Sequence, residues 1–316
     1  MPKLDLNLLR HLGALLSTRS VSRSAELLHV SQPVMSQALS RLRTHFDDPL
    51  LIRQGNTYIR TPLGETLLPL VNEALTSVEI AEDIKSTFSG ASSKRTFVVA
   101  ASDYAATTVL GSLRKILAVE APGIGIEVIT ASGRSAHRLD FANCDLVIGV
   151  TGYSLPGVSD TLFTDDFVAI VGAENPILNQ DTIDIRDIAN LPNATAYFGD
   201  EVATPVDRVF EDLSIQRNVV AQVSGYLALP HLVESTDLVA FVPRILAKQS
   251  QKNSSMVILE MPQDARGHIV EVMYWPPARD AEPASIWLRN TLNRACSDIS
   301  SSPDPLSLQL TNIPSS

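Results

Sequence analysis

The sequence predicts two kinds of structure in one chain: a mainly α, winged helix-turn-helix domain, and an α/β domain that follows a long linker helix. Three observations predict this. Residues 17–61 hold two short amphipathic stretches followed by a strand–turn–strand pattern. Apolar residues then repeat at helical spacing from 62 to 88. Beyond residue 96, apolar runs of strand length alternate with amphipathic stretches, which is typical of α/β domains.

The second helix of the N-terminal pair is expected from Ser31 to about Phe46, with one apolar and one polar face. Met35, Leu39 and Leu42 recur at helical spacing and can pack on the preceding helices. Short side chains begin the polar face, which lets a recognition helix approach base edges in a major groove. Ser31 can cap the helix, and the N–H groups above it suit a phosphate oxygen. The polar face and its flank comprise Gln32, Pro33, Ser36, Gln37, Ser40 and Arg43.

Positive charge is concentrated in the same segment. Residues 1–62 hold eight Lys or Arg and four Asp or Glu, a balance of +4, whereas the whole chain carries −10 and the remainder therefore −14. DNA is the expected partner of this basic segment. Arg53 and Arg60 flank the turn at 54–57, where a hairpin tip can contact a phosphate backbone or enter a minor groove. A solvated helix face and a solubilising hairpin remain the alternative.

Short motifs in the first 64 residues carry a family resemblance. They are Leu6-Asn7-Leu8-Leu9, Ser24-Ala25-Glu26-Leu27-Leu28, Ser31-Gln32-Pro33-Val34-Met35-Ser36, Leu39-Ser40-Arg41-Leu42-Arg43, Asp48-Pro49-Leu50-Leu51-Ile52-Arg53 and Thr61-Pro62-Leu63-Gly64. In combination they resemble LysR-type transcriptional regulators, and the branch that includes nodulation and aromatic-degradation regulators is especially similar. The resemblance implies DNA contacts at Ser31, Gln32, Pro33, Ser36 and Gln37, with Arg53 on the wing. Gln37 stands where many relatives have Arg, which implies a different direct readout there.

The apolar repeat after Thr61 predicts one long helix from Pro62 to Phe88, which would span roughly 40 Å at 1.5 Å per residue. Alone, such a helix would leave its apolar stripe in water, so it needs a partner. The partner is either the body of the same chain or the same helix of a second subunit, and the resemblance favours the dimer. The stripe expected at the dimer contact is Leu63, Leu67, Leu70, Ala74, Val78 and Ala81.

These patterns predict the boundaries of the domains. We expect a DNA-binding domain at 1–61, a linker and dimerisation helix at 62–88, a hinge at 89–95, an effector-binding domain at 96–298 and a flexible tail at 299–316. The resemblance implies two Rossmann-like subdomains in the manner of periplasmic binding proteins. The first lobe is expected at about 96–150 and 273–298, and the second at about 151–272. The chain would then cross between lobes near Val150–Thr151 and near Met273–Tyr274.

The elements of the effector-binding domain are expected at the following places. Strands are predicted at 96–101, 124–130, 145–150, 167–172, 218–223, 238–242 and 270–274, and helices at 105–118, 204–213, 227–234 and 283–295.

An effector in such a fold binds at the carboxyl ends of strands, against helix N-termini. Hydroxyls at those places can bind a carboxylate or a phenolate. The candidates are Ser102, Asp103, Ser132, Thr151 and Thr204. The resemblance supports Ser102 and Ser132, whereas plain N-capping is the alternative for each residue alone. Few basic residues lie near these strand ends, so a strongly anionic effector is not indicated, and a neutral or weakly acidic aromatic molecule fits as well.

The sequence offers little support for other chemistry. The six histidines are scattered without ligand spacing, so no metal site and no cofactor are expected. Cys144 and Cys296 lie in apolar or helical surroundings, which predicts two buried free thiols, with a redox sensor as the minor alternative. The N-terminus lacks the apolar core of a signal peptide, and no stretch reaches membrane-span length. A cytoplasmic protein that is not an enzyme is therefore expected.

These observations predict a transcriptional regulator, an activator when its effector is bound, which recognises a dyad-symmetric promoter site. A dyad site requires a homodimer, the resemblance suggests a homotetramer, and RNA polymerase is a further expected partner. Two alternatives remain. One is a solute-binding or enzymatic α/β protein with a helical extension, and the other is an effector-independent DNA-binding protein.

Overall fold

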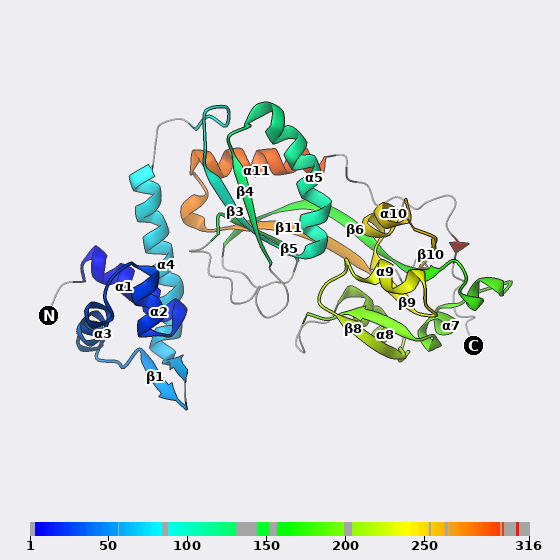
Figure 1. The fold of residues 1–316 in the computed structure, drawn as a ribbon, viewed down its shortest axis with the longest axis horizontal. Helices are drawn as coiled ribbons and strands as arrows, with labels where there is room; N and C mark the ends of the chain where they lie inside the picture. Colours follow the sequence, from blue (N-terminus) through cyan, green and yellow to red (C-terminus); the bar gives the residue numbers. More distant parts are fainter. Residues whose placement is uncertain are drawn as a thin grey trace. The chain divides into compact units, whose positions relative to one another are not determined.

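The structure is a computed structural model of residues 1–316, which describes residues 4–55, 57–83, 88–130, 144–151, 157–198, 204–252, 254–262, 265, 267–297, 299 and 308–309. It separates into two compact units (Figure 1). The first holds the N-terminal 87 residues together with segments 140–145 and 276–285. The second holds the rest, which contains all strands of the α/β domain.

The first unit begins with three helices, α1 (Leu6–Thr18), α2 (Val21–Leu27) and α3 (Gln32–Phe46). Asp5 caps α1 by accepting from the N–H of Leu8 at 2.7 Å, and Ser20 caps α2. The expected helix pair is therefore confirmed, with His29 at positive φ in its turn. One apolar core joins these helices to the wing and to the linker helix; its fully buried members include Leu12, Leu16, Met35, Leu42 and Leu50.

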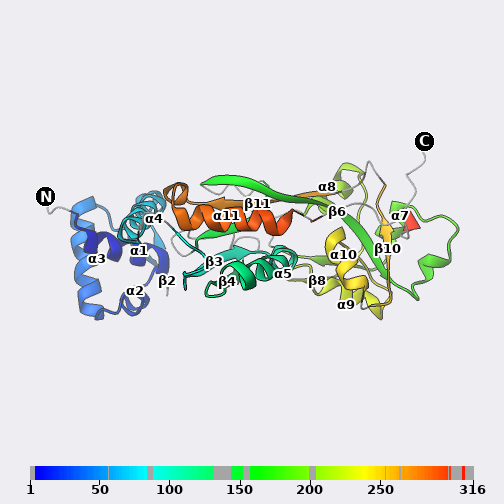
Figure 2. The same ribbon diagram turned by 90° about the horizontal axis from the view of Figure 1, so that it is seen from above.

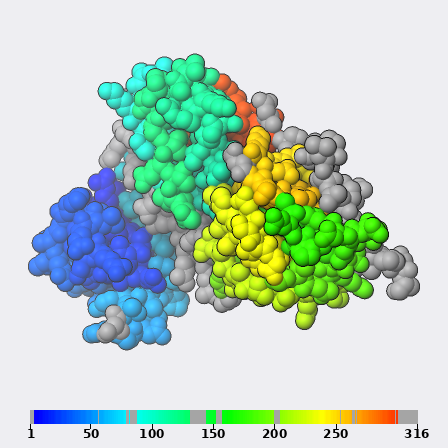
Figure 3. Space-filling view, turned by 45° about the vertical axis from the view of Figure 1, so that its right-hand side comes forward, coloured from blue at the N-terminus to red at the C-terminus, as the bar shows by residue number. Residues whose placement is uncertain are grey.

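The wing follows α3 as two short antiparallel strands, β1 (Leu51–Gln54) and β2 (Thr57–Arg60), with Arg53 opposite Tyr58. Figures 1 and 3 show it projecting from one end of the helical part of the unit. Gly55 lies in the turn at a φ of 60°, a conformation that glycine adopts without steric cost.

The linker helix α4 runs from Pro62 to Asp83, and Pro69 lies inside it. The predicted continuation to Phe88 reaches residues 84–87, which lie outside the described ones. Phe88 itself is not helical, and its ring lies 5.4 Å from that of Trp287. The predicted hinge at 89–95 contains a hydrogen-bonded turn, in which the N–H of Ser93 donates to the carbonyl of Ser89.

The first lobe of the second unit is a sheet of order β4-β3-β5-β11-β6. Its parallel strands are β3 (Thr96–Ala101), β4 (Gly125–Thr130) and β5 (Leu146–Val150), and its helices are α5 (Asp103–Glu120) and α11 (Pro283–Cys296). Two antiparallel strands complete it, β11 (His268–Trp275) and the first half of β6 (Val158–Gly172).

The second lobe continues from the same β6. Its strands are β7 (Asn193–Ala196), β8 (Val219–Val223), β9 (Val239–Pro243) and β10 (Met256–Glu260). Its helices are α7 (Ile185–Asn190), α8 (Pro205–Asp212), α9 (Leu229–Glu234) and α10 (Arg244–Gln251). Two 3-10 turns, η2 (Pro176–Asn179) and η4 (Pro277–Arg279), follow β6 and β11 respectively. The order is β8-β7-β9-β6, with β10 on the other edge of β6.

The crossings between the lobes differ from the predicted ones. β6 pairs with β11 up to Asp166 and with β9 from Phe167, so it passes from one lobe to the other between these two residues. β11 begins at His268, opposite Asp166. Figure 2 shows β6 and β11 side by side, as their pairing requires. The predicted crossings at 150–151 and 273–274 thus lie inside the first lobe, because one long strand serves both sheets.

The other predicted elements are present with small shifts of their ends. The sequence did not predict β7, β10, α7, α10 or the first half of β6. In the tail, expected to be flexible, β12 (Leu308–Gln309) pairs in parallel with β10.

Candidate DNA-binding and effector-binding sites

The predicted DNA-contacting face of α3 lies open to solvent. Met35, Leu39 and Leu42 are buried in the core of the unit, and they hold the opposite side of the helix. The side chains expected to contact DNA are all exposed: Ser31, Gln32, Pro33, Ser36, Gln37 and Ser40. Because its apolar side is packed in the core, the helix presents its polar face in a fixed orientation within the unit.

Ser31 occupies the N-cap position of α3, but its side chain makes no capping hydrogen bond. The expectation that this hydroxyl caps the helix is therefore wrong. Pro33 lies in the first turn and lacks an N–H, so a cap has one donor fewer to satisfy there. The hydroxyl of Ser31 and the remaining first-turn N–H groups can serve an anion instead.

The arginines near the wing have different partners. Arg53 lies at the wing tip, where its Nε donates to the carbonyl of Gly55 at 3.1 Å. Arg60 joins the wing to α1, because its guanidinium donates to the carbonyl of Leu16 at 2.7 Å. Arg43, an expected DNA contact, donates through Nε to the Pro49 carbonyl at 2.9 Å and through Nη2 to the Leu51 carbonyl at 3.1 Å.

The predicted dimerisation stripe on α4 has two environments. Leu63 and Leu67 pack against the core of the first unit. Leu70 is 58% exposed. Three further members of the stripe lie at the surface or half-buried: Ala74, Val78 and Ala81. A segment next to β11 in the sequence, η4, also packs against α4.

Ser102 and Asp103, at the carboxyl end of β3, begin helix α5. The hydroxyl of Ser102 caps the helix by accepting from the N–H of Ala105 at 3.1 Å. A carboxylate oxygen of Asp103 accepts from the N–H of Leu227 at 2.9 Å, so this side chain joins the two lobes. Gly225 allows that contact, since a Cβ there would lie 2.3 Å from Asp103 Oδ2.

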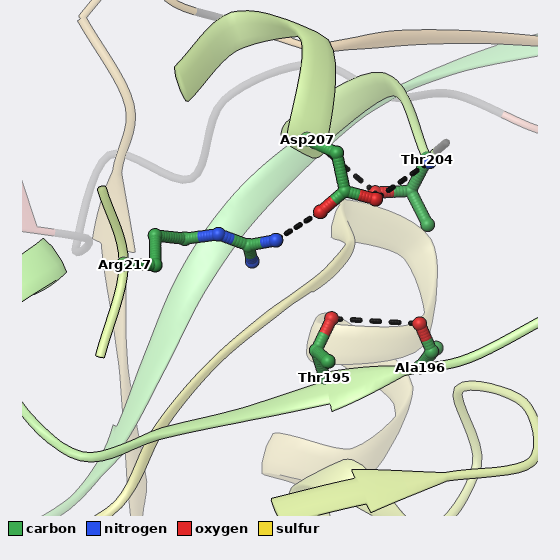
Figure 4. Close-up of polar contacts among 5 residues, drawn as sticks. All are labelled: Thr195, Ala196, Thr204, Asp207 and Arg217. Atoms are coloured by element: carbon green, nitrogen blue, oxygen red, sulfur yellow. Dashed lines mark hydrogen bonds and ion pairs between the residues drawn. The ribbon is translucent and has the colours of Figure 1, made fainter. Parts of the chain in front are cut away.

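Thr204 caps α8 through a reciprocal pair of contacts with Asp207 (Figure 4). Its hydroxyl donates to the Asp207 carboxylate at 2.7 Å and accepts from the N–H of Asp207 at 3.2 Å. Asp207 in turn pairs with Arg217. The hydroxyl that was expected to bind an effector therefore already serves the fold.

The remaining predicted effector contacts are Thr151 and Ser132. Thr151 is exposed, and its N–H donates to the carbonyl of Val270 on β11 at 3.0 Å. Ser132 lies outside the described residues.

Comparison with known proteins agrees with this arrangement. Residues 6–65 match the family described as bacterial regulatory helix-turn-helix protein, lysR family, and residues 90–297 match the LysR substrate binding domain. The chain belongs to the LysR family of transcriptional regulators. It is a LysR-type regulator, and not an enzyme, as the sequence predicted; the family binds DNA and small-molecule effectors and forms oligomers.

Individual relatives extend over nearly the whole LysR-type chain. Nodulation protein D 1 of Sinorhizobium fredii (strain NBRC 101917 / NGR234) is 30% identical over 287 residues, which cover 90% of this chain and 89% of that protein. Nodulation protein D of Rhizobium leguminosarum bv. trifolii is 28% identical over 95% of this chain and 94% of its own length.

Solved structures share the fold. Full-length OxyR from Pseudomonas aeruginosa superposes with a TM-score of 0.73 at 16% identity, and the match covers 96% of this chain and 97% of that chain. CbnR, a LysR family transcriptional regulator, gives a TM-score of 0.51 at 14% identity, and the match covers 91% of this chain and 99% of that chain.

The regulatory lobes of this LysR-type chain also contain buried ionisable groups that the sequence did not reveal. Asp165 on β6 and Glu271 on β11 are each only 1% exposed. The Tyr104 hydroxyl donates to Asp165 Oδ2 at 2.7 Å, and the N–H of Ile245 donates to the same oxygen. Glu271 Oε2 is buried and lacks a hydrogen-bond partner among the described groups.

Burial decides how these groups titrate. Loss of solvation, followed by repulsion from Asp165, raises the pKa of Glu271 to about 8. Loss of solvation also raises the pKa of Asp165, although hydrogen bonds from Tyr104 and two backbone N–H groups oppose the shift. The pKa of Tyr104 is raised as well, first by burial and then by the charge of Asp165. Glu271 is therefore largely protonated at neutral pH.

Two features of the sequence mark these acids, although neither predicts that they are buried together. Glu271 interrupts the apolar strand 269–275, and Asp165 precedes the apolar run that starts at Phe167. Adjacent residues on a strand, such as Asp165 and Asp166 on β6, point to opposite faces of the sheet. The two acids have different surroundings, since Asp165 is buried and Asp166 contacts the imidazole of His268 at 2.6 Å.

Both cysteines are buried thiols, as predicted. Burial raises the pKa of the Cys296 thiol to about 11, which disfavours the reactive thiolate. The described part of the chain contains no group of three His, Cys, Asp or Glu side chains placed to hold a metal ion. Among the described helices, none has both the length and the apolar character that a membrane span needs.

Proposed function

We propose that this LysR-type regulator is an effector-responsive activator that binds a dyad-symmetric promoter site as a homodimer or homotetramer. The exposed polar face of α3 carries the proposal, because its apolar side is fixed in the core while Gln32 and Ser36 face solvent. Gln32 has the donor and acceptor needed to pair with adenine in the major groove. Ser31, Pro33, Gln37 and Ser40 extend the contact surface. Arg53 at the wing tip would contact the phosphate backbone.

Dimerisation would place two such faces on one duplex. In the monomer Leu70 is 58% exposed, and burying a leucine contributes about 1.5–3 kcal/mol. Ala74, Val78 and Ala81 continue from Leu70 at steps of four, four and three residues, the spacing of one helix face. A second copy of α4 would cover this face, whereas Leu63 and Leu67 would lie at its margin.

The effector site is proposed where the two lobes meet, at Ser102, Asp103 and Thr151. Ser132, which lies outside the described residues, and Thr204, whose hydroxyl would have to leave its cap contact with Asp207, are the further proposed contacts. The contact from Asp103 to the N–H of Leu227 supports this site, because an effector that replaces it would change the relation of the lobes. The aromatic rings nearby suit a small neutral or weakly acidic aromatic molecule. The rings of Tyr104 and Tyr226 meet edge to face, with their centroids 6.4 Å apart, and the ring of Phe198 lies 5.2 Å from that of Tyr226.

The signal would pass to DNA through β11. β11 pairs with β6, the strand that belongs to the sheets of both lobes. It is followed in the chain by η4, which packs against α4. A change in the lobes would thus alter the spacing of the two DNA-binding heads or the bend of the promoter. RNA polymerase at that promoter is the proposed further partner, and the cytoplasm, where promoter DNA lies, is the proposed location.

Selection from a pool of random-sequence duplexes tests this function. The intact protein is expected to enrich a dyad-symmetric sequence with half-sites about one helical turn apart. Enrichment of no common sequence would contradict the proposal. A thermal-shift screen of small aromatics and acids tests the effector site, and Ser102→Ala is expected to reduce the response to a compound that binds.

A further inference from the structure

The loop between α3 and the wing adopts a conformation that needs external support. It contains Asp47 at a φ of 51° and Leu50 at a φ of 59°. The left-handed region is unfavourable for residues with a Cβ, and Leu50 is also fully buried. The direction in which the wing leaves α3 therefore depends on contacts that hold this loop.

One set of contacts joins the loop to Thr61, the residue before α4. Asp48 Oδ1 accepts from the N–H of Leu50 at 2.6 Å and from the hydroxyl of Thr61 at 2.7 Å. The N–H of Thr61 donates to the carbonyl of Leu50 at 3.0 Å. These bonds connect the loop to the start of α4, but none of them reaches α3.

The N–H groups of Asp47 and Asp48 already bond to the carbonyl of Arg43, which joins the start of the loop to α3. The connection from α3 to the far end of the loop and to the wing is made by the side chain of Arg43. Its Nε donates to the carbonyl of Pro49 at 2.9 Å, and its Nη2 donates to the carbonyl of Leu51, the first residue of β1, at 3.1 Å. The planar guanidinium can serve two carbonyls at fixed positions, whereas a lysine ammonium is a single centre on a flexible stem. The side chain thus spans from the last turns of α3 to the base of the wing.

We propose that Arg43 is a positioning residue, which fixes the wing relative to α3, and that it does not act as a phosphate contact. This inference rests on the proposed DNA contacts of α3 and of Arg53 at the wing tip. The positioning role explains why an arginine can lie on the polar face of the recognition helix without contacting a base. Its loss would displace Arg53 from the duplex and weaken binding to any sequence.

Arg41 offers a matched control on the same helix. It carries the same charge, but its guanidinium lies 3.7 Å from a carboxylate oxygen of Asp5 at the start of α1. The variants Arg43→Lys, Arg43→Met and Arg41→Met therefore separate the loss of charge from the loss of the wing contact. All are made in the full-length protein, and circular dichroism checks that each variant folds.

Two measurements are made on every variant: amide hydrogen exchange of residues 51–60, and affinity for a random-sequence duplex over a series of salt concentrations. Arg43→Lys and Arg43→Met are both expected to speed wing exchange at least roughly fivefold and to weaken duplex binding by a similar factor. Arg41→Met should leave wing exchange as in the wild type. Equal defects in the two Arg43 variants, despite their different charge, are the signature of positioning.

A phosphate contact would give another pattern. Arg43→Lys would then bind like the wild type, Arg43→Met would lower the salt slope by about one, and neither would change wing exchange. That result overturns the assignment. If the wild type itself failed to bind duplex, the proposed DNA-binding function would fail, while the exchange data would still decide whether Arg43 holds the wing.

Discussion

The DNA-binding head and the regulatory lobes distribute their polar groups in opposite ways. In the head, the core is apolar, and the side chains proposed to contact DNA lie outside it, as Gln32 and Ser36 do. In the lobes, ionisable groups lie inside, with Asp165, Glu271 and Arg244 almost completely buried. This difference means that the DNA-contacting side chains of the head can be changed with little effect on its free energy of unfolding. In the lobes, a change of one buried ionisable group alters stability, because each such group depends on its neighbours.

The largest effect is expected at the buried ion pair of the second lobe. Arg244 on α10 contacts Glu260 on β10, and both side chains are inaccessible to solvent. Removing one partner leaves an uncompensated buried charge, so Arg244→Met should lower the free energy of unfolding by about 3–5 kcal/mol. Urea unfolding measures it. The double change Arg244→Met with Glu260→Leu should recover most of the loss; a double variant as unstable as the single one would show that packing, and not charge, dominates.

A second prediction concerns pH. The pKa of Glu271 is about 8 in the folded chain, above its unfolded value, so the folded state holds this proton more tightly. The stability contributed by protonated Glu271 is complete below the unfolded pKa and is lost as the pH rises to about 8. Glu271→Gln removes this dependence. Its free energy of unfolding relative to the wild type should rise with pH by on the order of 1 kcal/mol per unit between pH 5 and 8.

Urea titrations at several pH values in that range check this. Parallel wild-type and Glu271→Gln stabilities would mean that Glu271 is ionised when folded. A head variant such as Gln32→Ala serves as the control. It should follow the wild type at every pH, because an exposed amide neither titrates nor supports the core.

The third prediction tests the dimer through Leu70. A charge at this position would have to be buried between two copies of α4, so Leu70→Glu should weaken self-association at least about tenfold. Leu70→Met keeps an apolar side chain and should associate like the wild type. Sedimentation across a concentration series measures both. Unchanged association of Leu70→Glu would place the interface elsewhere.

The smallest effect is expected at Thr204. Its hydroxyl is engaged with Asp207, so Thr204→Ala should cost about 1 kcal/mol of stability, whereas Thr204→Ser should keep the cap. Thermal unfolding compares the two. If Thr204→Ala were as stable as the wild type, the capping contacts would contribute nothing, and a role toward a ligand would become the better explanation of this residue.

The same contrast explains which parts of the molecule could be predicted from the sequence. The face of α3 follows from periodicity alone, because Met35, Leu39 and Leu42 fix which side is buried. The first half of β6 shows neither an apolar run nor a regular alternation, and it is a strand because it pairs with β11, about 100 residues later. The strand around Glu271 was predicted, but not the burial of this acid. That burial depends on β6 and α5, which no local pattern reveals.

The capping residues illustrate the same limit. Ser31 has the sequence of an N-cap, yet its side chain makes no capping bond, while Ser102 and Thr204 do cap their helices. Sequence identifies the end of a helix, but a hydroxyl's rotamer depends on the surrounding packing.

The most direct test is the sequence preference of Gln32→Ala compared with the wild type, measured by selection from the same random duplex pool. The wild type should enrich a dyad with half-sites about one turn apart. The variant should remain folded and lose discrimination at one symmetric pair of base positions, by roughly 1–3 kcal/mol each. Identical sequences selected by both proteins would contradict the assignment of α3 as the helix that reads DNA.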